Sequence, residues 1–369
     1  MTQDKGVVYR DNLDIDIKYD LSTLKNYKLV QPGDFIISLR SFQGGFETSY
    51  LTGITSPAYT IFNFIDNQDK DHAFWQYLFK RIDFINSLKR VTFGIRDGKA
   101  ISFSQFGDVK VKYPSFDEQK HIATALTKLD NTIQFHERKC EELALIKKAL
   151  LQKLFPKKDE FKPEVRYKNF SDTWEQRKFF DNIEKVIDFR GRTPKKLGME
   201  WSAEGYTALS ALNVKDGYID FTADVHYANQ DLYDKWMAGN DLYKGQVLFT
   251  TEAPMGNVAQ VPDNRKYVLS QRTIAFNVDE TKVTNDFLAV LLRSQNVQHT
   301  LKSLASGGTA QGVSQKSLSQ LKVILPINPK EQQEIGNFFN YFDSLIALHQ
   351  RKLEKLKQLK KFLLQNMFI

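Results

Sequence analysis

Three polar loops in the second half of the chain combine the residue types that proteins use to read DNA. They are residues 190–196 (Arg-Gly-Arg-Thr-Pro-Lys-Lys), 250–257 (Thr-Thr-Glu-Ala-Pro-Met-Gly-Asn) and 307–312 (Gly-Gly-Thr-Ala-Gln-Gly). Arginine and lysine can contact guanine edges, glutamine and asparagine can contact adenine edges, and glycine-rich backbone lets phosphates approach closely. Ordinary turn chemistry explains each loop taken singly. Taken together in a basic chain, the loops make DNA contact an equally good interpretation.

The candidate DNA contacts come from these loops and from three positions in the first half of the chain. In the second half they are Arg190, Arg192, Thr193, Lys195, Lys196, Glu252, Asn257, Thr309 and Gln311. In the first half they are Arg40, Gln43 and Arg96. A net charge of +8 and an isoelectric point of about 9.1 suit a polyanionic partner, although many basic proteins bind no nucleic acid.

Motifs for catalysis are missing from the sequence. Residues 94–99 (Gly-Ile-Arg-Asp-Gly-Lys) are one residue short of a phosphate-binding GxxxxGK[ST] loop, and no HExxH or strand-following GxGxxG occurs. The six histidines lack ligand spacing, and the single cysteine, Cys140, can form neither an intramolecular disulfide nor a structural zinc site. We therefore expect no catalysis by this chain alone, and no metal or cofactor of its own.

The elements that position the loops are repeated. Apolar residues at alternating steps of four and three form one set, Ile122, Leu126, Leu129, Ile133, His136 and Cys140. A second set follows the same steps, namely Ile335, Phe339, Phe342, Ile346, His349 and Leu353. Each member of the second set lies 213 residues after its partner, as Asp343 does after Asp130 and Phe368 after Phe155. The chain is an internal duplication.

The repeated spacing is that of a coiled-coil seam. No Pro or Gly interrupts residues 118–155, and Pro156 ends the first helix; the second helix runs from Glu331 to the C-terminus, with Gly336 as its weak point. His136 and His349 share one seam position. We interpret it as a polar position that fixes register, in preference to a metal site or a pH switch. Cys140, on the same seam, is interpreted as a small packing residue, not as a nucleophile.

The segment before each helix has a different pattern. Short β-rich runs are separated by Gly, Asn, Asp and Pro at residues 35–39, 59–64, 247–251, 273–278 and 321–325. A helix-like stretch at 73–88 repeats at 285–301. We expect an α+β fold in which two domains alternate with two long helices. The expected boundaries are 1–115 (first domain), 116–156 (first helix), 157–165 (charged, proline-bounded linker), 166–328 (second domain) and 329–369 (second helix).

The first copy begins later than the second. Residues 166–212 have no partner, because their counterparts would precede Met1. If the protein starts at Met1, through rearrangement or frameshift, we expect the first domain to lack strands and part of its core, and to read DNA weakly. A misassigned start codon is the other explanation.

The order of these pieces resembles the specificity (S) subunit of type I restriction-modification systems. The matching residues are 114–119 (Pro-Ser-Phe-Asp-Glu-Gln) and 326–332 (Pro-Ile-Asn-Pro-Lys-Glu-Gln), each followed by its helix. Residues 174–178 (Trp-Glu-Gln-Arg-Lys), leading to 190–194, look like the start of a target recognition domain, and residues 248–257 look like its middle. The resemblance covers nearly the whole chain.

The resemblance implies a non-catalytic DNA-binding subunit in the bacterial cytoplasm. Two α/β target recognition domains would each read one half of a bipartite site in double-stranded DNA. The helices would pair as an antiparallel coiled coil that spaces the half-sites and docks two methyltransferase (modification) subunits. Those partners would bring S-adenosylmethionine and adenine methylation, and restriction (motor) subunits would bring ATP, Mg and cleavage. The alternative is a coiled-coil protein-interaction scaffold without DNA specificity, for example an inactive truncated subunit.

Overall fold

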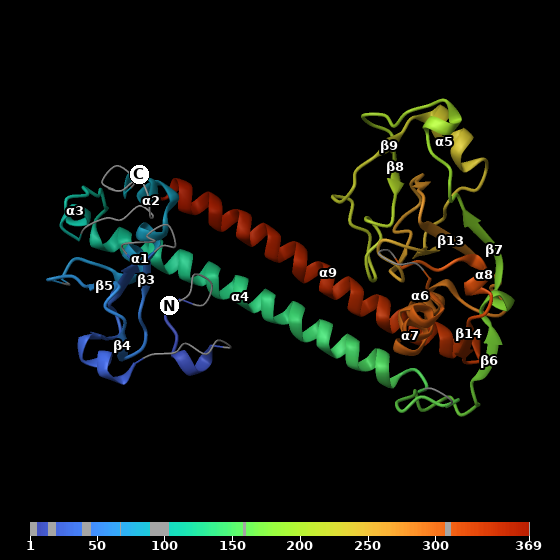
Figure 1. Ribbon diagram of the computed structural model, residues 1–369, viewed down its shortest axis with the longest axis horizontal. Coiled ribbons are helices and arrows are strands. Elements are labelled where there is room, and N and C mark those ends of the chain that lie inside the picture. Colours follow the sequence, from blue (N-terminus) through green and yellow to red (C-terminus); the bar gives the residue numbers. More distant parts are fainter. Residues whose placement is uncertain are drawn as a thin grey trace. The chain divides into compact units, whose positions relative to one another are not determined.

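A computed structural model describes residues 6–13, 20–38, 46–66, 68–88, 103–157, 160–306 and 311–368. Contacts divide the chain into two compact units, which we call unit 1 (Met1–Glu137 with Arg351–Ile369) and unit 2 (Arg138–Gln350). Each unit contains a β-rich domain and part of each of two long helices (Figure 1).

Unit 1 contains a small antiparallel sheet covered by helices. Its elements are η1 (Arg10–Asn12), η2 (Leu21–Asn26), β1 (Lys28–Val30), β2 (Phe35–Ser38), β3 (Phe46–Thr48), β4 (Gly53–Thr55), β5 (Tyr59–Phe62), α1 (His72–Lys80), α2 (Ile82–Leu88), α3 (Phe103–Gly107) and the start of α4 (Phe116–Lys153). The strand order in the sheet is β3-β2-β5, and β1 pairs separately with β4. Phe35 and Phe46 of the sheet pack with Phe74 of α1, and Leu126 of α4 closes this core.

Unit 2 has a larger sheet with a core on each face. Its elements are β6 (Glu175–Lys178), η5 (Phe179–Asn182), β7 (Ile183–Asp188), η6 (Lys195–Leu197), β8 (Tyr206–Leu209), β9 (Tyr227–Ala228), α5 (Gln230–Met237), β10 (Val247–Thr250), β11 (Val258–Gln260), β12 (Val268–Leu269), β13 (Thr273–Val278), α6 (Asn285–Arg293), α7 (Gln295–Leu304), α8 (Gln315–Leu318), β14 (Lys322–Leu325) and the start of α9 (Pro329–Asn366). The main sheet has the order β11-β10-β13-β7, and smaller sheets are β12-β8-β9 and β14-β6. Phe249 and Phe276 face the core that includes α6, whereas Leu248 and Ala275 face the core that includes α5. Burial on both faces explains why these strands are continuously apolar.

The duplication extends to hydrogen bonds at the start of each long helix. The Oε1 atom of Gln119 accepts a bond of 3.2 Å from the backbone N–H of Asp71, which caps α1. The Oε1 atom of Gln332 accepts a bond of 3.0 Å from the backbone N–H of Thr284, which caps α6. Both glutamines are buried. The Glu-Gln pair that marks each helix in the sequence therefore ties that helix to the domain before it.

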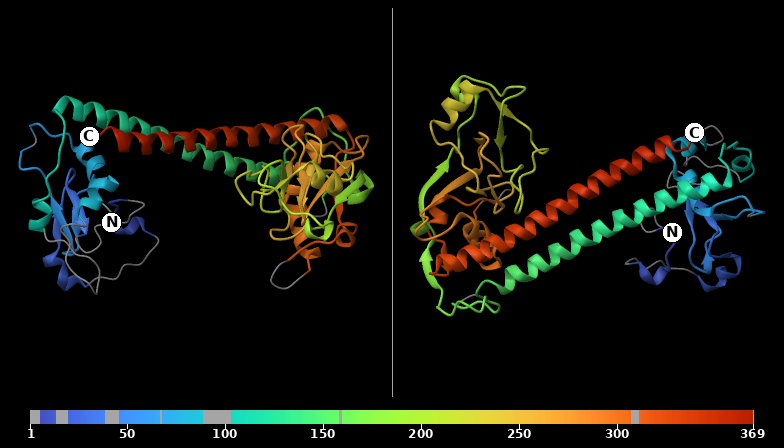
Figure 2. Two further views of the ribbon diagram at one scale, coloured as in Figure 1. Left: turned by 90° about the horizontal axis from the view of Figure 1, so that it is seen from above. Right: turned by 180° about the vertical axis from the view of Figure 1, so that it is seen from behind.

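The two long helices pack together in opposite directions. In unit 1, Asp130 of α4 pairs with Lys360 of α9 at 2.6 Å, and Glu137 of α4 pairs with Lys357 at 2.8 Å. Residue numbers thus rise along one helix as they fall along the other, and both views in Figure 2 show α4 and α9 side by side. The expected α+β fold with two paired long helices is confirmed.

The predicted seam lies on the covered side of these helices. Ile122, Leu126, Leu129, Ile133, His136, Ile335 and Phe339 are buried, and Cys140, Phe342, Ile346, His349 and Leu353 are half-buried. Burial is deepest where a helix also packs against a domain, because a helix pair alone covers only one side of each seam residue.

Two expectations about helices need correction. The stretches at 73–88 and 285–301 are each two helices, because Arg81 and Ser294 leave the helical conformation with ψ of 139° and 149°. These two residues are 213 apart, so the break itself is repeated. Gly336 is not a weak point. A Cβ atom there would lie 2.6 Å from the Cβ of Asp286, so glycine allows α9 to lie directly against the start of α6.

Candidate nucleic-acid interface

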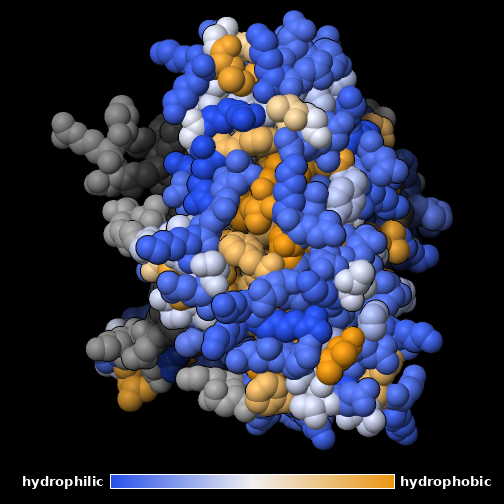
Figure 3. Space-filling view, turned by 90° about the vertical axis from the view of Figure 1, so that its right-hand side faces the viewer, coloured by the Kyte–Doolittle hydropathy of each residue, from blue (hydrophilic) through white to orange (hydrophobic). Residues whose placement is uncertain are grey.

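The loops chosen from the sequence meet at one edge of the main sheet in unit 2. Thr250, the last residue of β10, pairs with Thr273, the first residue of β13, and Asp188, the last residue of β7, pairs with Ile274. Because these neighbours are antiparallel, the end of β7, the start of β13 and the end of β10 lie at the same edge. We call residues 188–198, 250–257, 270–273 and 311–316 the loop edge. Figure 3 views the side of unit 2 that carries β6, β7 and α8, where mostly hydrophilic side chains surround a hydrophobic hollow.

The segment before α8 is attached to both neighbouring loops. The backbone N–H of Val313 donates to the carbonyl of Thr251 at 2.9 Å, and Gly312 forms an antiparallel bridge with Glu252. A Cβ atom at Gly312 would lie 3.1 Å from the Cβ of Glu252, so glycine is needed for this close approach. On the other side, Nε2 of Gln315 donates to Oδ2 of Asp188 at 2.8 Å. Residues 311–316 therefore join the end of β7 to the end of β10.

Arg190 is held by the carboxylate of Asp188. Its Nε and one terminal amino group donate to Oδ2 at 2.9 and 2.7 Å, and its backbone N–H donates to Oδ1 at 2.9 Å. Burial alone would raise the pKa of Asp188, but the hydrogen bonds from Arg190 and Gln315 outweigh it and lower the pKa. The carboxylate therefore stays ionised at neutral pH and fixes both side chains at the loop edge.

Arg192, another predicted DNA contact, is half-buried and makes contacts within its own domain. Its guanidinium lies 4.5 Å from the ring centre of Phe189 and donates to the carbonyl of Trp236. Its own carbonyl accepts a bond from the side chain of Gln271. These contacts fasten residues 189–198 to α5, so Arg192 shapes the loop.

The remaining candidates of this loop differ in exposure. Lys195 and Lys196 are both exposed, and Nζ of Lys196 donates to the carbonyl of Gly191 at 2.6 Å. Oγ1 of Thr193 accepts from the backbone N–H of Lys196 at 3.2 Å and stabilises the turn. Lysines that lie on such a turn can contact phosphates, which orient a protein on DNA without reading sequence.

In the β10–β11 loop, Glu252 and Asn257 have separate partners. Oε1 of Glu252 lies 2.7 Å from Nε of Arg272. The side-chain amide of Asn257 donates to the carbonyl of Val214 at 2.9 Å, which anchors the loop. Gln311 is exposed beside Gly312.

Four of the candidates, Thr309, Arg40, Gln43 and Arg96, lie outside the described residues. Sequence reasoning missed Arg272, Gln315 and Asp188, which the structure places at the loop edge. Arg272 lies just before a strand that the sequence predicts, so it could have been found by comparing which strand ends share one edge of the sheet.

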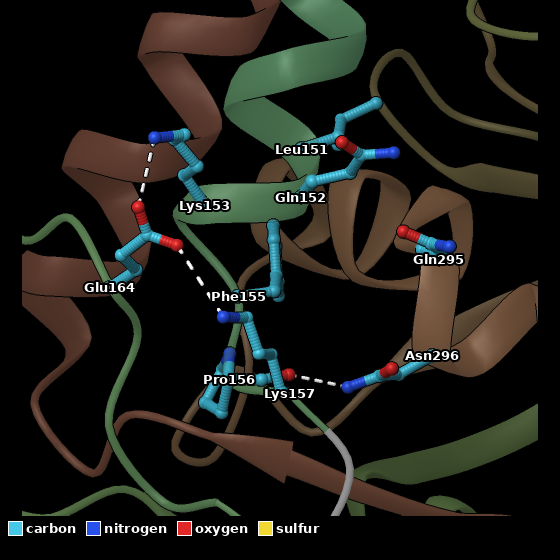
Figure 4. A pocket seen from close by; sticks show the side chains of 9 residues that line it. All are labelled: Leu151, Gln152, Lys153, Phe155, Pro156, Lys157, Glu164, Gln295 and Asn296. Carbon is cyan, nitrogen blue, oxygen red and sulfur yellow. Dashed lines mark hydrogen bonds and ion pairs between the residues drawn. The ribbon is translucent and has the colours of Figure 1, made fainter.

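A small hollow lies elsewhere in unit 2, between the end of α4 and the start of α7 (Figure 4). It has a volume of about 240 Å³. Glu164 at its rim pairs with Lys153 at 2.8 Å and with Lys157 at 3.6 Å, so the positive charge there is partly neutralised. It lacks the arginines of the loop edge and is a weaker candidate for a DNA contact.

Within the described ranges, no group of three or more His, Cys, Asp and Glu residues is arranged to hold a metal ion. None of the helices in that part of the chain is long and apolar enough to cross a membrane.

Curated proteins include relatives of this chain. The chain is 25% identical over 295 residues to the putative type I restriction enzyme MjaX specificity subunit of Methanocaldococcus jannaschii, covering 77% of this chain and 64% of that protein. It is 26% identical over 266 residues to the type I restriction enzyme MjaVIII specificity subunit of the same organism, covering 69% and 60%. The chain thus spans less than two thirds of the length of these relatives.

Solved structures show the same fold. The crystal structure of a type I restriction-modification S subunit from M. genitalium gives a TM-score of 0.63 at 14% identity, covering 93% of this chain and 84% of that one. A chain from a structure of the type I R-M system, described for its complex assembly and conformational transition, gives 0.51 at 13% identity, covering 92% and 83%.

A family model separates the two copies. The model of the type I restriction modification DNA specificity domain matches residues 7–145 and again residues 172–358. Each match covers one β-rich domain with much of the long helix after it. The chain therefore belongs to the type I restriction modification DNA specificity domain family.

Proposed function

We propose that this chain is the DNA-specificity subunit of a type I restriction-modification complex and performs no catalysis itself. The observation that carries the proposal is the duplication of a β-rich domain with its long helix, each copy of which matches the DNA specificity domain. The loop edge of unit 2 supports it, because the carboxylate of Asp188 at the end of β7 fixes the side chains of Arg190 and Gln315 there. Fixed polar side chains of this kind suit direct base reading.

The bipartite target follows from the two copies. Each β-rich domain reads one half-site, and each is followed in the chain by one of the paired helices α4 and α9. The counterpart of the loop edge in unit 1 includes the ends of β2 and β3, between which Arg40 and Gln43 lie in the sequence. These two residues, with Arg96, remain the proposed contacts of the first half-site, and Thr309 and Gln311 remain proposed contacts of the second.

The helices also provide surfaces for two modification subunits. Large apolar side chains are exposed on them at positions related by the duplication, Phe135 with Leu348 and Ile146 with Leu359. Single exposed apolar residues are common, but exposure at equivalent positions in both units suits two copies of one partner. S-adenosylmethionine would belong to those partners, and ATP and Mg to the restriction subunits.

Selection from a library of randomised DNA duplexes tests this function. The full chain, in complex with the modification subunits of its own system, should enrich a site of two specified parts separated by an unspecified spacer. Native mass spectrometry should show two modification subunits per chain. The logarithm of the affinity should fall linearly with the logarithm of the salt concentration.

The alternative function is a protein-interaction scaffold without DNA specificity. It predicts salt-insensitive binding of partners and no enriched sequence. An absence of DNA binding by the complex at low salt would exclude the specificity function and leave the scaffold.

A further inference from the structure

Arg272 stands at the loop edge in a conformation that its neighbours impose. Its φ angle is +65°, in the left-handed region that residues other than glycine seldom adopt. The carbonyl of Arg272 accepts bonds from the backbone N–H of Thr251 at 2.8 Å and from its Oγ1 at 3.2 Å. Strained backbone held in this way is concentrated at functional sites, so the outlier suggests a role for this side chain.

In the part of the chain that the structure describes, the guanidinium of Arg272 is held at a single point. Its Nε lies 2.7 Å from Oε1 of Glu252, and its side chain is 56% exposed. Neither terminal amino group makes a hydrogen bond to another described residue of the chain. Glu252 is itself fixed, because its backbone bridges to Gly312.

The other two arginines of the loop edge are less available. Arg190 uses both Nε and a terminal amino group on Asp188, and its side chain is 36% exposed. Arg192 is stacked on Phe189 and bonded to a carbonyl. Bidentate recognition of guanine needs two N–H donors directed at O6 and N7. Of these three arginines, Arg272 is the one whose two terminal amino groups are both available to donate to a guanine.

We propose that Arg272 reads a guanine in the second half-site through its two terminal amino groups, and that Glu252 is the positioning residue that aims it. This inference rests on the proposed function and names one determinant of its specificity. Glu252 was expected to contact DNA itself. The Oε1 atom of Glu252 instead pairs with Nε of Arg272, and this ion pair sets the direction of the Arg272 guanidinium.

The test is selection from the randomised duplex library by the full chain in complex with its modification subunits. Arg272→Gly removes the side chain and suits the left-handed backbone, so the variant should fold at least as well as the parent. It should lose preference for guanine at one position of one half-site by roughly ten- to a hundredfold, with the other positions retained. Arg272→Lys should lose most of that preference while keeping overall affinity, because an ammonium group cannot replace the planar fork.

Two further variants separate reading from positioning. Glu252→Gln should weaken preference for the same guanine, by less than Arg272→Gly does, and should change no other position. Arg265→Ala is the matched control. Arg265 also pairs with a carboxylate, Asp263 at 2.9 Å, but it lies beyond the opposite end of β11. This control should select the parental site.

The outcomes are distinguishable. An unchanged selected site in Arg272→Gly overturns the inference and leaves the proposed function intact. A uniform loss at all positions also overturns it, since that result marks a phosphate contact. A new change at a cytosine in Glu252→Gln, with Arg272→Gly silent, shows that Glu252 is the reader. If the parental complex enriches no site, the proposed function fails, and the inference falls with it.

Discussion

Glu118 and Glu331 occupy equivalent positions at the start of the two long helices, but their surroundings differ. Glu331 is 1% exposed and accepts two hydrogen bonds from Arg166, at 2.6 and 2.8 Å, and one from the indole of Trp174 at 3.2 Å. Glu118 is exposed. Arg166 and Trp174 lie in the segment that leads into β6. In unit 2 the helix start is therefore a buried anchor, because residues of this segment cover it.

The sheet of unit 2 is also more extensive than the sheet described in unit 1. In unit 2, β7 extends the main sheet beside β13, and β6 pairs with β14. In the described part of unit 1, β5 pairs with β2 alone, and residues 109–113, the counterpart of β14, form no strand. The core of unit 1 is correspondingly small and rich in phenylalanine, including Phe35 and Phe46. Large aromatic side chains bury much apolar surface with few residues, which suits a small sheet.

The helix pair, by contrast, is nearly symmetric. Asp130 of α4 pairs with Lys360 of α9 in unit 1, and Asp343 of α9 pairs with Lys147 of α4 in unit 2. Each member is 213 residues from its counterpart. The second partner differs, because Tyr77 donates to Asp130 at 2.8 Å, whereas Arg293 donates to Asp343 at 2.7 Å. The repeat thus keeps the contacts between the helices and varies those made with each domain.

Removal of the carboxylate at each helix start should give the largest difference in stability between the two units. Glu331→Ala leaves the Arg166 guanidinium without its partner in a buried site, so we expect a loss of about 3–5 kcal/mol in the free energy of unfolding. Glu118→Ala should change it by less than about 0.5 kcal/mol, because an exposed carboxylate has little to lose. Urea denaturation of the two variants measures the difference. Equal losses would show that Glu331 does not anchor its domain.

Neutralising the equivalent aspartates, Asp343 and Asp130, should give a smaller difference in the free energy of unfolding. Asp343→Asn leaves the buried Lys147 without a carboxylate partner and the buried Arg293 with Asp216 alone, and we expect a loss of about 2–4 kcal/mol. Asp130→Asn should cost about 1 kcal/mol, because Lys360 is partly exposed and Tyr77 can still donate to the amide oxygen. Thermal unfolding of both variants, with the parent as reference, decides the order. A larger loss for Asp130→Asn would contradict this account of the helix pair.

The order of domains and long helices could be predicted because local sequence patterns determine it. The steps of four and three from Ile122 onwards mark a helix seam, and the offset of 213 residues identifies the second copy without any knowledge of contacts. Five of the strands (β2, β5, β10, β13 and β14) were predicted for the same reason, since continuous apolar runs such as residues 247–251 lie between turn residues. The helix breaks at Arg81 and Ser294 could not be predicted, because neither residue type is a helix breaker.

The candidate site was harder, because its members meet only after folding. Arg192 is of a residue type that commonly contacts DNA. Its guanidinium instead packs on the ring of Phe189 and donates to the carbonyl of Trp236, which is distant in the sequence. Arg272 lies in a short turn outside the three loops chosen from the sequence, and the antiparallel pairing of β13 with β10 brings it to Glu252. Glu331 looked like a helix-start residue, yet its partner Arg166 is 165 positions away. Side-chain direction at a shared sheet edge depends on register, which residue type does not encode.

The smallest effect is expected at Lys147, and its sign is informative. Burial lowers the pKa of Lys147, with the nearby charge of Arg293 acting in the same direction, and the attraction of Asp343 does not restore it. A lysine whose pKa is lowered on folding destabilises the folded state while the pH is below that lowered value, and the penalty disappears as the pH rises above the unfolded pKa. Lys147→Met, which keeps the stem and leaves Asp343 bonded to Arg293, should therefore leave the free energy of unfolding at neutral pH unchanged or raise it by up to about 1 kcal/mol. Any advantage over the parent should shrink as the pH rises toward and past the ordinary lysine pKa of 10.5, as followed by urea denaturation at each pH. A Lys147→Met loss as large as that of Asp343→Asn would instead show that Asp343 depends on both cations equally, and that the helix pair of unit 2 is a true charge network.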